Sequence, residues 1–460
     1  MPAPVFGFLA FTSGSFEGAI IRDMRLANAL HARGHKVAVY WMMDRNPDLV
    51  SPGITQRTLC RGSRYQFKKP CGVMDKLAAP FFAIPAHMRR TFMQRHPDYL
   101  DRLMTNLCRS ICDGGHSDPK LARRLANFIR KDGVTHLLPT FAMICPFAQA
   151  AKQIPNAPQF DYLVTFQGEE IFANYAQRLG RLSDYHQRLR ETVAASPWPA
   201  VAVSRDYIDR LRDEMGIDPT RLRAIYPGIE LPTSMEKPRF DVLYKKFPKL
   251  TLDEPIVTYI GRQDSEKGID LLLYAAKMLQ ERGLRMQLVI CGGSSFGERY
   301  RYVLKHISEH LRLFVHHRRR IPGEMRDALY AYSRCIVYPS IHREPFGMVA
   351  AESMSNGTPV IVPDIGGITE SIEVDGLRGG LTFRCWDSAD LANQLQRLLT
   401  DDQLHAELSA NTRSIAGNFT VEKMTDRILD HLGLSTKVPT PEPAPTPESL
   451  VSSSSGRGLG

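Results

Sequence analysis

Short apolar runs alternate with segments of helical period along most of this 460-residue chain. The run VFGFLAF at 5–11 predicts a strand, and KVAVYW at 36–41 predicts the next one. Between them, residues 18–35 place apolar side chains on one helical face and end at a glycine stop, Gly34. Nearly continuous apolar strands joined by helices are typical of a parallel sheet with both faces covered.

The alternation stops between residues 42 and about 120, and we interpret that stretch as a basic insertion in a first domain spanning 1–230. It then resumes with short apolar runs separated by segments of helical length. The expected strands after the insertion lie at 135–140, 161–168, 200–204 and 223–228.

A charged connector at 235–255 precedes a second round of the same rhythm, which we assign to a second domain at 231–415. Its expected strands lie at 256–261, 286–293, 312–317, 335–340 and 359–364. The predicted fold class is therefore α/β, with two Rossmann-like domains in tandem. An amphipathic helix is predicted within 416–434, and the Pro/Ser-rich tail 435–460 is expected to be disordered.

The basic residues are concentrated in one region of the chain. The formal net charge of +10 arises within residues 51–150, and the rest of the chain is close to neutral. Within it, residues 74–96 mix aromatic and aliphatic side chains with several arginines, a combination that suits an anionic membrane surface. The alternative is a solvated basic insertion whose cations cover its own apolar groups. Nucleic acid is not an expected partner, because no recognised nucleic-acid fold signature accompanies the charge.

The eight cysteines are scattered and include no Cys-x-x-Cys pair, so we expect neither a zinc site nor a disulfide framework. That usage favours a reducing compartment, the cytoplasm. No charged region precedes the apolar run Val5 to Phe11, so it is interpreted as a strand and not as a signal peptide. No run of 18 apolar residues occurs, so no membrane span is expected.

Candidate chemistry gathers after the strands of the second domain, where ligands of open α/β sheets bind. In YIGRQDSEKG at 259–268, Arg262 sits at a strand tip and Lys267 is expected to begin the next helix. A guanidinium and an ammonium in these places would hold a diphosphate. The alternative is a pair of solvated loop cations.

Two further strand ends give weaker signals. Gly292 and Gly293 would let the backbone approach a ligand closely, although glycines end many strands. A turn at Ile321 to Glu324 could offer backbone groups to a flat base, or it could simply lead into a helix.

The segment YPSIHREPFGMVAAESMSNG at 338–357 places two glutamates around a short apolar stretch. Pro345 suits the first turn of a helix, so Glu344 would lie just before that helix and Glu352 about two turns inside it. One carboxylate could grip the hydroxyls of a sugar and the other the diol of a ribose. Alternatively, they are a capping charge and a surface residue. The backbone amides expected to face a phosphate or sugar belong to Phe346, Gly347 and Met348.

Taken in order, strand-GR, EKG, YPS, EPFG and Glu-x7-Glu resemble the retaining glycosyltransferases of family 4, which have the GT-B fold. The segment 11–40 resembles that family's glycine-rich first loop and helix, and 224–231 resembles the segment that joins its two domains. The segment 419–432 resembles its C-terminal helix, which crosses back to the first domain. The resemblance covers roughly residues 5 to 432, except for the insertion.

The resemblance implies a role for each matching position. Arg262 and Lys267 would hold the donor diphosphate and stabilise the charge that builds on it. Glu352 would bind the ribose hydroxyls and Glu344 would contact the transferred sugar. The residues expected across the cleft, near the phosphates or the acceptor, are Gly14, Ser15 and Gly18.

One departure concerns the first domain. The family commonly has a histidine before a glycine here, whereas this chain reads VTFQGEE, with Gln167 at that place. Glutamine can hydrogen-bond a sugar hydroxyl but cannot carry a proton. An alternative is that Glu169 or Glu170 takes part in the site. Otherwise these two residues are simply the solvated start of a helix.

No Asp-x-Asp pair occurs in the chain. We therefore expect fixed cations and helix N-termini to replace a divalent metal, and no cofactor beyond a nucleoside-diphosphate-sugar substrate. The resulting hypothesis is a cytoplasmic, retaining glycosyltransferase, peripheral at the inner membrane face, acting on a glycan or lipid-linked acceptor in polysaccharide, glycolipid or other glycoconjugate synthesis. The alternatives are a nucleotide-sugar epimerase or hydrolase on the same fold, and a catalytically silent binding protein.

Overall fold

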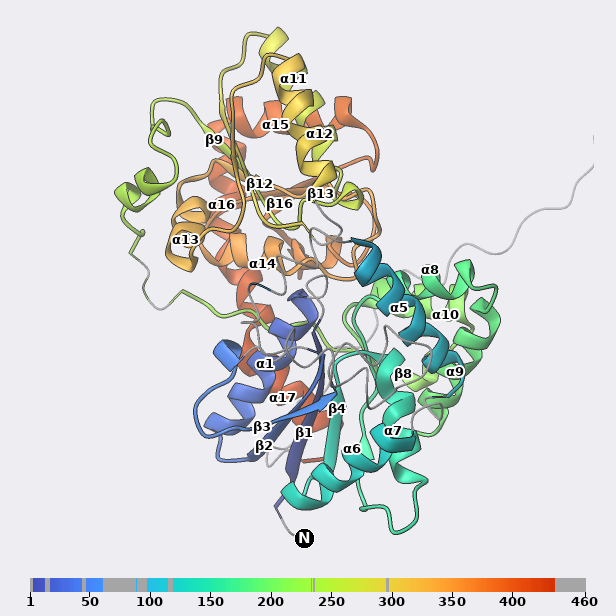
Figure 1. Ribbon diagram of the computed structural model, residues 1–460. Coiled ribbons are helices and arrows are strands. Elements are labelled where there is room, and N and C mark those ends of the chain that lie inside the picture. Colours follow the sequence, from blue (N-terminus) through green and yellow to red (C-terminus); the bar gives the residue numbers. More distant parts are fainter. Residues whose placement is uncertain are drawn as a thin grey trace, which may run out of the picture.

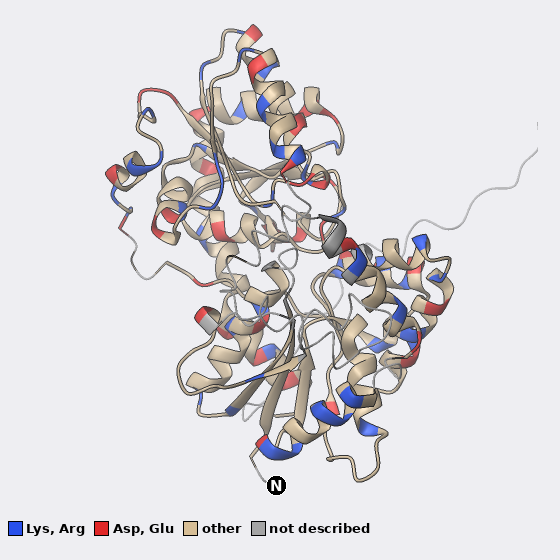
Figure 2. Ribbon diagram, viewed as in Figure 1, with Lys and Arg blue, Asp and Glu red and all other residues tan. Residues whose placement is uncertain are grey.

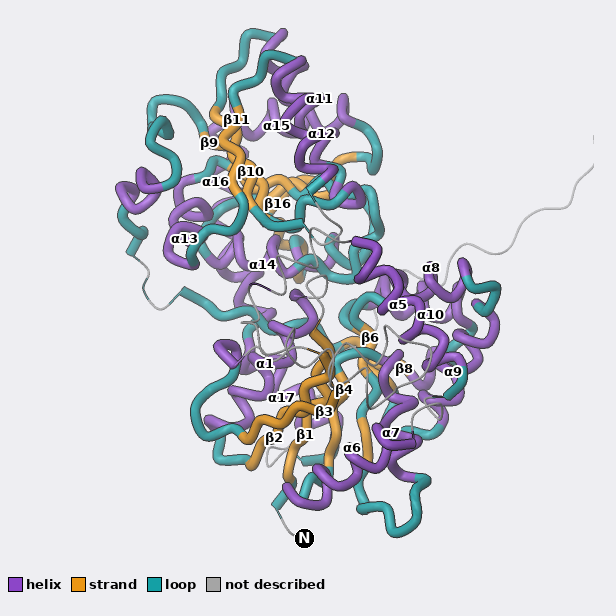
Figure 3. Tube along the Cα trace, in the orientation of Figure 1, coloured by secondary structure: helices purple, strands orange, loops and turns teal. Residues whose placement is uncertain are grey.

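The computed structural model describes residues 3–12, 17–43, 47–60, 88, 97–114, 119–232, 234, 236–294 and 298–434. These residues form two α/β domains, each with a sheet between layers of helices (Figures 1 and 3). Some residues named in the sequence expectations lie outside the described ranges. They are Gly14 and Ser15 of the first loop, most of the basic stretch 61–96, and the tail 435–460.

The first domain is built on a parallel sheet in the order β3-β2-β1-β4-β5. Alternate residues of the central strand β1 belong to two different cores: Phe6 and Phe8 pack into one, Leu9 and Phe11 into the other. The continuous apolar run therefore arises because both faces of the sheet are covered. The strands are β1 (Val5–Thr12), β2 (Lys36–Met43), β3 (Thr55–Cys60), β4 (His136–Pro139) and β5 (Asp161–Tyr162).

The single strand expected at 161–168 is wrong in detail, because the chain changes sheets there. Leu163 N donates to Leu137 O (2.9 Å), whereas Val164 O accepts from Val201 N (2.8 Å) on the other side. After this change a second parallel sheet continues the domain. Its strands are β6 (Thr165–Phe166), β7 (Ala200–Ala202) and β8 (Leu222–Ala224).

Helices cover both faces of these sheets (Figure 1). Helix α6 buries its apolar stripe and carries Lys and Arg along its other side, where they are visible in Figure 2. Among the described helices none is both long and apolar enough to cross a membrane. The helices of this domain are α1 (Glu17–Ala32), α5 (Pro97–Cys112), α6 (Pro119–Asp132), α7 (Cys145–Lys152), α8 (Glu170–Arg178), α9 (Leu182–Ala194) and α10 (Arg205–Met215).

The second domain has one parallel sheet in the order β11-β10-β9-β12-β13-β16. This is the doubly wound order, and it reverses between β9 and β12, which lie side by side. The prediction of a second Rossmann-like domain is confirmed. The strands are β9 (Ile256–Ile260), β10 (Gln287–Cys291), β11 (Val315–Arg318), β12 (Cys335–Val337), β13 (Val360–Pro363) and β16 (Gly380–Phe383).

A short antiparallel ribbon of β14 (Glu373–Val374) and β15 (Leu377–Arg378) comes between β13 and β16 in the chain. Helices again flank both faces (Figure 3). They are α11 (Ile269–Glu281), α12 (Arg299–His310), α13 (Gly323–Tyr332), α14 (Met348–Ser355), α15 (Ser388–Thr400) and α16 (Asp402–Ala416).

The last described helix, α17 (Val421–His431), returns to the first domain and packs beside α1 (Figure 1). Ile229 N donates to Phe419 O (2.7 Å) and Val421 N donates back to Ile229 O (3.1 Å), so the backbone is paired where the chain crosses. Gly228 is required at this crossing, because a Cβ there would lie 2.6 Å from Val421 Cα. The expectation of a C-terminal helix that crosses back is confirmed.

Candidate active site

A cleft of about 810 Å³ lies between the two domains and receives side chains from both. Its second-domain wall consists of the tips of β9, β10 and β12 and the start of α14. Its first-domain wall comes from α1 and from the loop after β6. The cleft therefore lies where the strand order of the second sheet reverses, the usual ligand position in an open α/β sheet.

Lys267 and Glu344 form a buried ion pair on the second-domain wall, with Lys267 Nζ in contact with Glu344 Oε1. Lys267 is 4% and Glu344 7% exposed. Ser340 Oγ donates to the same carboxylate oxygen (2.8 Å). Burial alone would raise the pKa of Glu344, but Lys267 and His342 lower it below the ordinary value. Glu344 is thus an ionised, hydrogen-bonded carboxylate, and Lys267 is no solvated loop cation.

A close approach of two loops brings this pair together. Gly268 adopts a left-handed conformation (φ 57°), and a Cβ on it would lie 2.2 Å from Pro339 O. Ile341 N donates to Glu266 O (3.1 Å), which joins the same loops. Lys267 therefore ends a 3-10 turn at Ser265–Lys267, and α11 begins only at Ile269. The expectation that Lys267 begins the helix is wrong, because the left-handed Gly268 separates the two elements.

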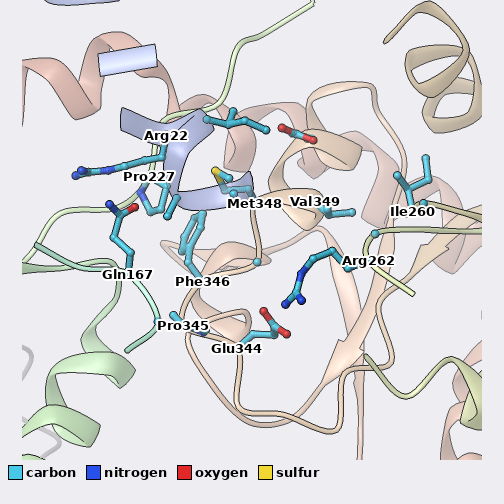
Figure 4. A pocket seen from close by; sticks show the side chains of 18 of the residues that line it. Arg22, Gln167, Pro227, Ile260, Arg262, Glu344, Pro345, Phe346, Met348 and Val349 are labelled. Atoms are coloured by element: carbon cyan, nitrogen blue, oxygen red, sulfur yellow. The ribbon is translucent and has the colours of Figure 1, made fainter. Parts of the chain in front are cut away.

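Arg262 extends from the tip of β9 into the same cleft, on the side of Glu344 (Figure 4). Its Nη1 donates to Asp264 Oδ2 (2.7 Å) and its Nη2 to Glu266 Oε1 (2.6 Å). The side chain is 25% exposed, so the guanidinium is partly open to the cleft. These carboxylates hold it in a fixed orientation, as a phosphate clamp requires.

Helix α14 begins at Met348, three residues after Pro345, so the expectation that Pro345 lies in its first turn is wrong. Gly347 precedes the helix with φ 80°, and a Cβ on it would lie 2.6 Å from Ile368 Cδ1. Helical geometry cannot pass through that left-handed residue. Glu352 consequently lies little more than one turn inside the helix, not two. Phe346, Gly347 and Met348 all line the cleft, and the role expected for their backbone amides stays a prediction.

Glu352 is engaged at both oxygens. Arg25 Nη2 of α1 donates to Oε1 (3.1 Å) and Tyr330 OH of α13 donates to Oε2 (3.3 Å). Its side chain is 16% exposed. Glu352 is therefore a partly buried residue of the cleft, and the alternative of a surface helix residue is wrong.

The glycine pair after β10 lines the cleft together with Ile321. Gly292 has φ 141°, and a Cβ on it would lie 1.6 Å from Gly261 O. The protein's own backbone therefore requires glycine there, before any ligand is considered. Gly293 has no such conflict, since the atom nearest to its added Cβ is Arg320 Nε at 3.7 Å. The helix after Ile321 begins at Gly323, inside the turn expected at 321–324.

Gly18 and Gln167 face the cleft from the first domain. A Cβ on Gly18 would lie 3.5 Å from Met348 Cε, so α1 passes close to the start of α14. Gln167 Nε2 donates to Thr140 O (2.7 Å) and to Asp23 Oδ1 (3.2 Å). Both amide hydrogens of Gln167 are thereby directed at the protein.

Glu169 does not line the cleft. It is fully buried and accepts hydrogen bonds from the backbone amides of Ala142, Gln167 and Gly168, each at 3.0 Å. Its carboxylate therefore shapes the loop that presents Gln167, and the alternative that it acts directly in the cleft is not supported by its position. The side chain of Glu170 lies outside the described residues.

The sequence did not single out several charged or hydroxyl residues of the cleft. Two of them, Arg22 and Arg25, lie on α1, one and about two turns after Gly18. The signal available was an arginine pair at helical spacing on a helix that is otherwise packed against the core. The other charged or hydroxyl residues of the cleft that were not anticipated are Asp48, Glu230, Glu266, Arg320, Arg326, Tyr330, Tyr338 and His342.

Residues 243–415 match the family model described as "Glycosyl transferases group 1". A D-inositol 3-phosphate glycosyltransferase of Salinispora tropica is 30% identical over 258 residues, which are 53% of this chain and 52% of that enzyme. The enzyme of the same name from Thermobifida fusca is 25% identical over 430 residues, covering 91% and 88%. This chain thus aligns with about half the length of the Salinispora enzyme.

Solved structures share the fold. A sucrose-phosphate synthase of Thermosynechococcus elongatus superposes with a TM-score of 0.68 at 22% identity, over 94% of this chain and 98% of that one. The Anabaena protein HepE, solved in complex with UDP and glucose, gives a TM-score of 0.63 at 17% identity, over 93% and 99%. The fold is therefore GT-B, and the relatives that match in sequence are glycosyltransferases.

Proposed function

We propose that this chain is a retaining glycosyltransferase, which moves a sugar from a nucleoside-diphosphate sugar to an acceptor hydroxyl. One observation carries the proposal. Arg262, Lys267 and Glu344 lie together on one wall of an interdomain cleft, and Glu352 lies on the same wall beside α13. Two cations for a diphosphate and two acids for hydroxyl groups are the groups that such a donor needs.

In the proposed mechanism the bond between the anomeric carbon and the donor phosphate oxygen breaks while Arg262 and Lys267 stabilise the charge on the departing diphosphate. An oxygen of that phosphate takes the proton of the acceptor hydroxyl. The acceptor oxygen then bonds to the anomeric carbon on the face that the phosphate leaves. The configuration is retained, and the transfer needs no protein nucleophile.

The acids have separate tasks in this proposal. Glu344, held ionised by Lys267, accepts hydrogen bonds from hydroxyls of the transferred sugar. Glu352 accepts from the ribose hydroxyls, in place of the hydrogen bonds that it now receives from Arg25 and Tyr330. Closure of the two domains would exclude water and limit hydrolysis of the donor.

We also propose that the reaction is independent of a divalent metal. The buried ammonium of Lys267 and the oriented guanidinium of Arg262 supply positive charge where a metal would otherwise be needed. The absence of an Asp-x-Asp pair from the sequence supports the same view. No cofactor is proposed.

For acceptor and location, the proposal is a glycan or lipid-linked acceptor in polysaccharide, glycolipid or other glycoconjugate synthesis, used in the cytoplasm by an enzyme peripheral to the membrane. The basic, aromatic sequence at 74–96 is its support. We expect the protein to bind anionic vesicles. This binding should be lost at high salt and on deletion of residues 74–96. Absence of vesicle binding by the full chain would remove the membrane part of the proposal.

The catalytic proposal is tested in two stages. First, nucleotide sugars are screened for thermal stabilisation, where a ligand present at 100 times its Kd should stabilise by about 2.7 kcal/mol. Second, the stabilising donor is incubated with and without candidate acceptors, with excess EDTA throughout. We expect transfer with retention, seen by NMR of the anomeric proton, and little hydrolysis without acceptor. Equal turnover with and without acceptor would indicate a hydrolase or epimerase instead.

A further inference from the structure

Arg22 is a charged residue of the cleft for which the proposed reaction has no role. It lies on α1, one turn after Gly18, and its side chain appears with Gln167 on the first-domain side of the cleft (Figure 4). Yet only 2% of its surface is exposed. A buried arginine is rare unless its donors are paired, so its partners are informative.

Only part of the guanidinium is satisfied. Nη1 donates to Asp23 Oδ1 (2.8 Å), but Nε and Nη2 are buried and have no hydrogen-bond partner among the described residues. These two nitrogens form one edge of the planar group and present two parallel N–H bonds. That edge matches two oxygens of a phosphate or a carboxylate. Leaving it unpaired costs the full desolvation penalty of the donors.

The neighbours of Arg22 fix this edge but do not fill it. Asp23 is itself 2% exposed, and its Oδ1 also accepts from Gln167 Nε2 (3.2 Å). Gln167 in turn donates to Thr140 O (2.7 Å). The three side chains Arg22, Asp23 and Gln167 therefore form a connected group whose unused donors are those of Arg22.

We infer that the Nε–Nη2 edge of Arg22 binds an anionic group, a phosphate or a carboxylate, carried by the acceptor or by the transferred sugar. The donor diphosphate has its own proposed cations, Arg262 and Lys267, on the second-domain wall. Arg22 instead lies on the first-domain wall and is joined to Gln167 through Asp23. This inference rests on the proposed function and names a specificity of the same cleft: substrates with a second anionic group are preferred.

Burial raises the pKa of Asp23, against the opposing effect of Arg22. Desolvation thus disfavours the charged form of the carboxyl that lies next to the free edge of Arg22.

The test compares wild-type protein with Arg22→Met, which keeps the length and apolar stem but removes the charge and the edge. The matched control is Arg33→Met, directly after the end of the same helix, outside the cleft and paired with Asp426. Thermal stabilisation by UDP, GDP and ADP is measured first, because it reports on the donor site and hence on the proposed function. Arg22→Lys serves as a second variant that keeps the charge without the fork.

Two pairs of probes then separate the source of the anion. D-inositol 3-phosphate against inositol, and glucose 6-phosphate against glucose, test an anionic acceptor in the presence of the stabilising nucleotide. UDP-glucuronic acid against UDP-glucose tests an anionic transferred sugar. Affinities are measured by calorimetry.

We expect at least one charged probe to bind the wild type and Arg33→Met about tenfold or more tightly than its neutral partner. In Arg22→Met the ratio of the two affinities should fall to about one, and in Arg22→Lys the ratio should be intermediate. A wild type without preference in any pair, or an Arg22→Met variant that keeps the preference, overturns the inference. Either result can be obtained while nucleotide binding is intact. Failure of the Arg22 inference is therefore distinct from failure of the proposed function. Absence of nucleotide stabilisation in the wild type would instead count against the donor site.

Discussion

Arg25 and Glu352 join the two domains across the cleft, with Arg25 Nη2 donating to Glu352 Oε1 at 3.1 Å. Arg25 also donates to the carbonyl of Gly228, in the segment that connects the domains (3.2 Å). The acid proposed for the ribose thus accepts a hydrogen bond from an arginine of the opposite domain. In the proposed function, donor binding and domain closure would therefore act on the same carboxylate.

Replacing Glu352 by Gln should weaken nucleoside-diphosphate binding about tenfold, since a charge-assisted acceptor of two hydroxyls becomes a neutral amide. Titration calorimetry measures the effect. Tyr330→Phe is the control, because it removes only the hydroxyl on Glu352 Oε2 and leaves the carboxylate intact. An affinity in Glu352→Gln that equals the wild-type value would contradict the ribose assignment.

Lys267→Ala should remove about 3 kcal/mol of transition-state stabilisation and so slow the transfer, as when a hydrogen-bond donor to a developing anion is removed. Steady-state rates at saturating donor provide the measurement. Lys277→Ala is the matched control, because this lysine lies on the neighbouring α11, pairs with Glu281 and does not line the cleft.

Loss of Lys267 also leaves Glu344 buried and unpaired, which by itself costs about 3–5 kcal/mol of stability. The double variant Lys267→Met with Glu344→Gln removes both charges and should recover most of that stability. It should remain as inactive as the single lysine variant. Recovery of activity together with stability would show that Lys267 acts only on folding.

The stability contributed by Glu344 should depend on pH in a defined direction. Its folded-state pKa is depressed below 4.5 by Lys267 and its other partners, against its burial. Its contribution is therefore fully present above about pH 4.5 and is lost as the pH falls through the folded-state pKa. The difference in Tm between wild type and Glu344→Gln should be largest near neutral pH and should narrow below pH 4.5.

The exposed acid Glu373, paired with Arg378 at the surface, offers the comparison for that measurement. Glu373→Gln should change Tm little, because surface ion pairs contribute about 0–1 kcal/mol. A difference for Glu344→Gln that stays constant from pH 7 to pH 3 would argue against an ionised Glu344 in the folded protein.

The two glycines after β10 should respond differently to the same change. Gly292→Ala places a Cβ 1.6 Å from Gly261 O in a positive-φ conformation, so we expect a loss of at least about 3 kcal/mol. Gly293→Ala meets nothing closer than 3.7 Å and should change stability by less than about 1 kcal/mol. The thermal midpoints of the two variants, measured side by side, test this difference. Similar losses of stability in both variants would contradict the clash predicted at Gly292.

The sequence by itself determined the architecture. Apolar runs such as 256–261 and 36–41 form strands that are buried on both faces, and burial on both faces is what makes a run continuously apolar. Because the carboxyl ends of parallel strands meet at one edge, the order of the runs also placed Arg262, Lys267 and Glu344 at a common cleft.

Only the tertiary structure decided the details that depend on contacts between distant segments. Gly347 in a left-handed conformation against Ile368 moves the start of α14 past Pro345, and no local propensity reveals that contact. The same is true of the contacts of Arg25 with Glu352 and of Asp23 with Gln167, which join residues of two helices and a loop. Pattern and period fix which residues face a core, whereas the partner of a buried charge is fixed by how the packed elements meet.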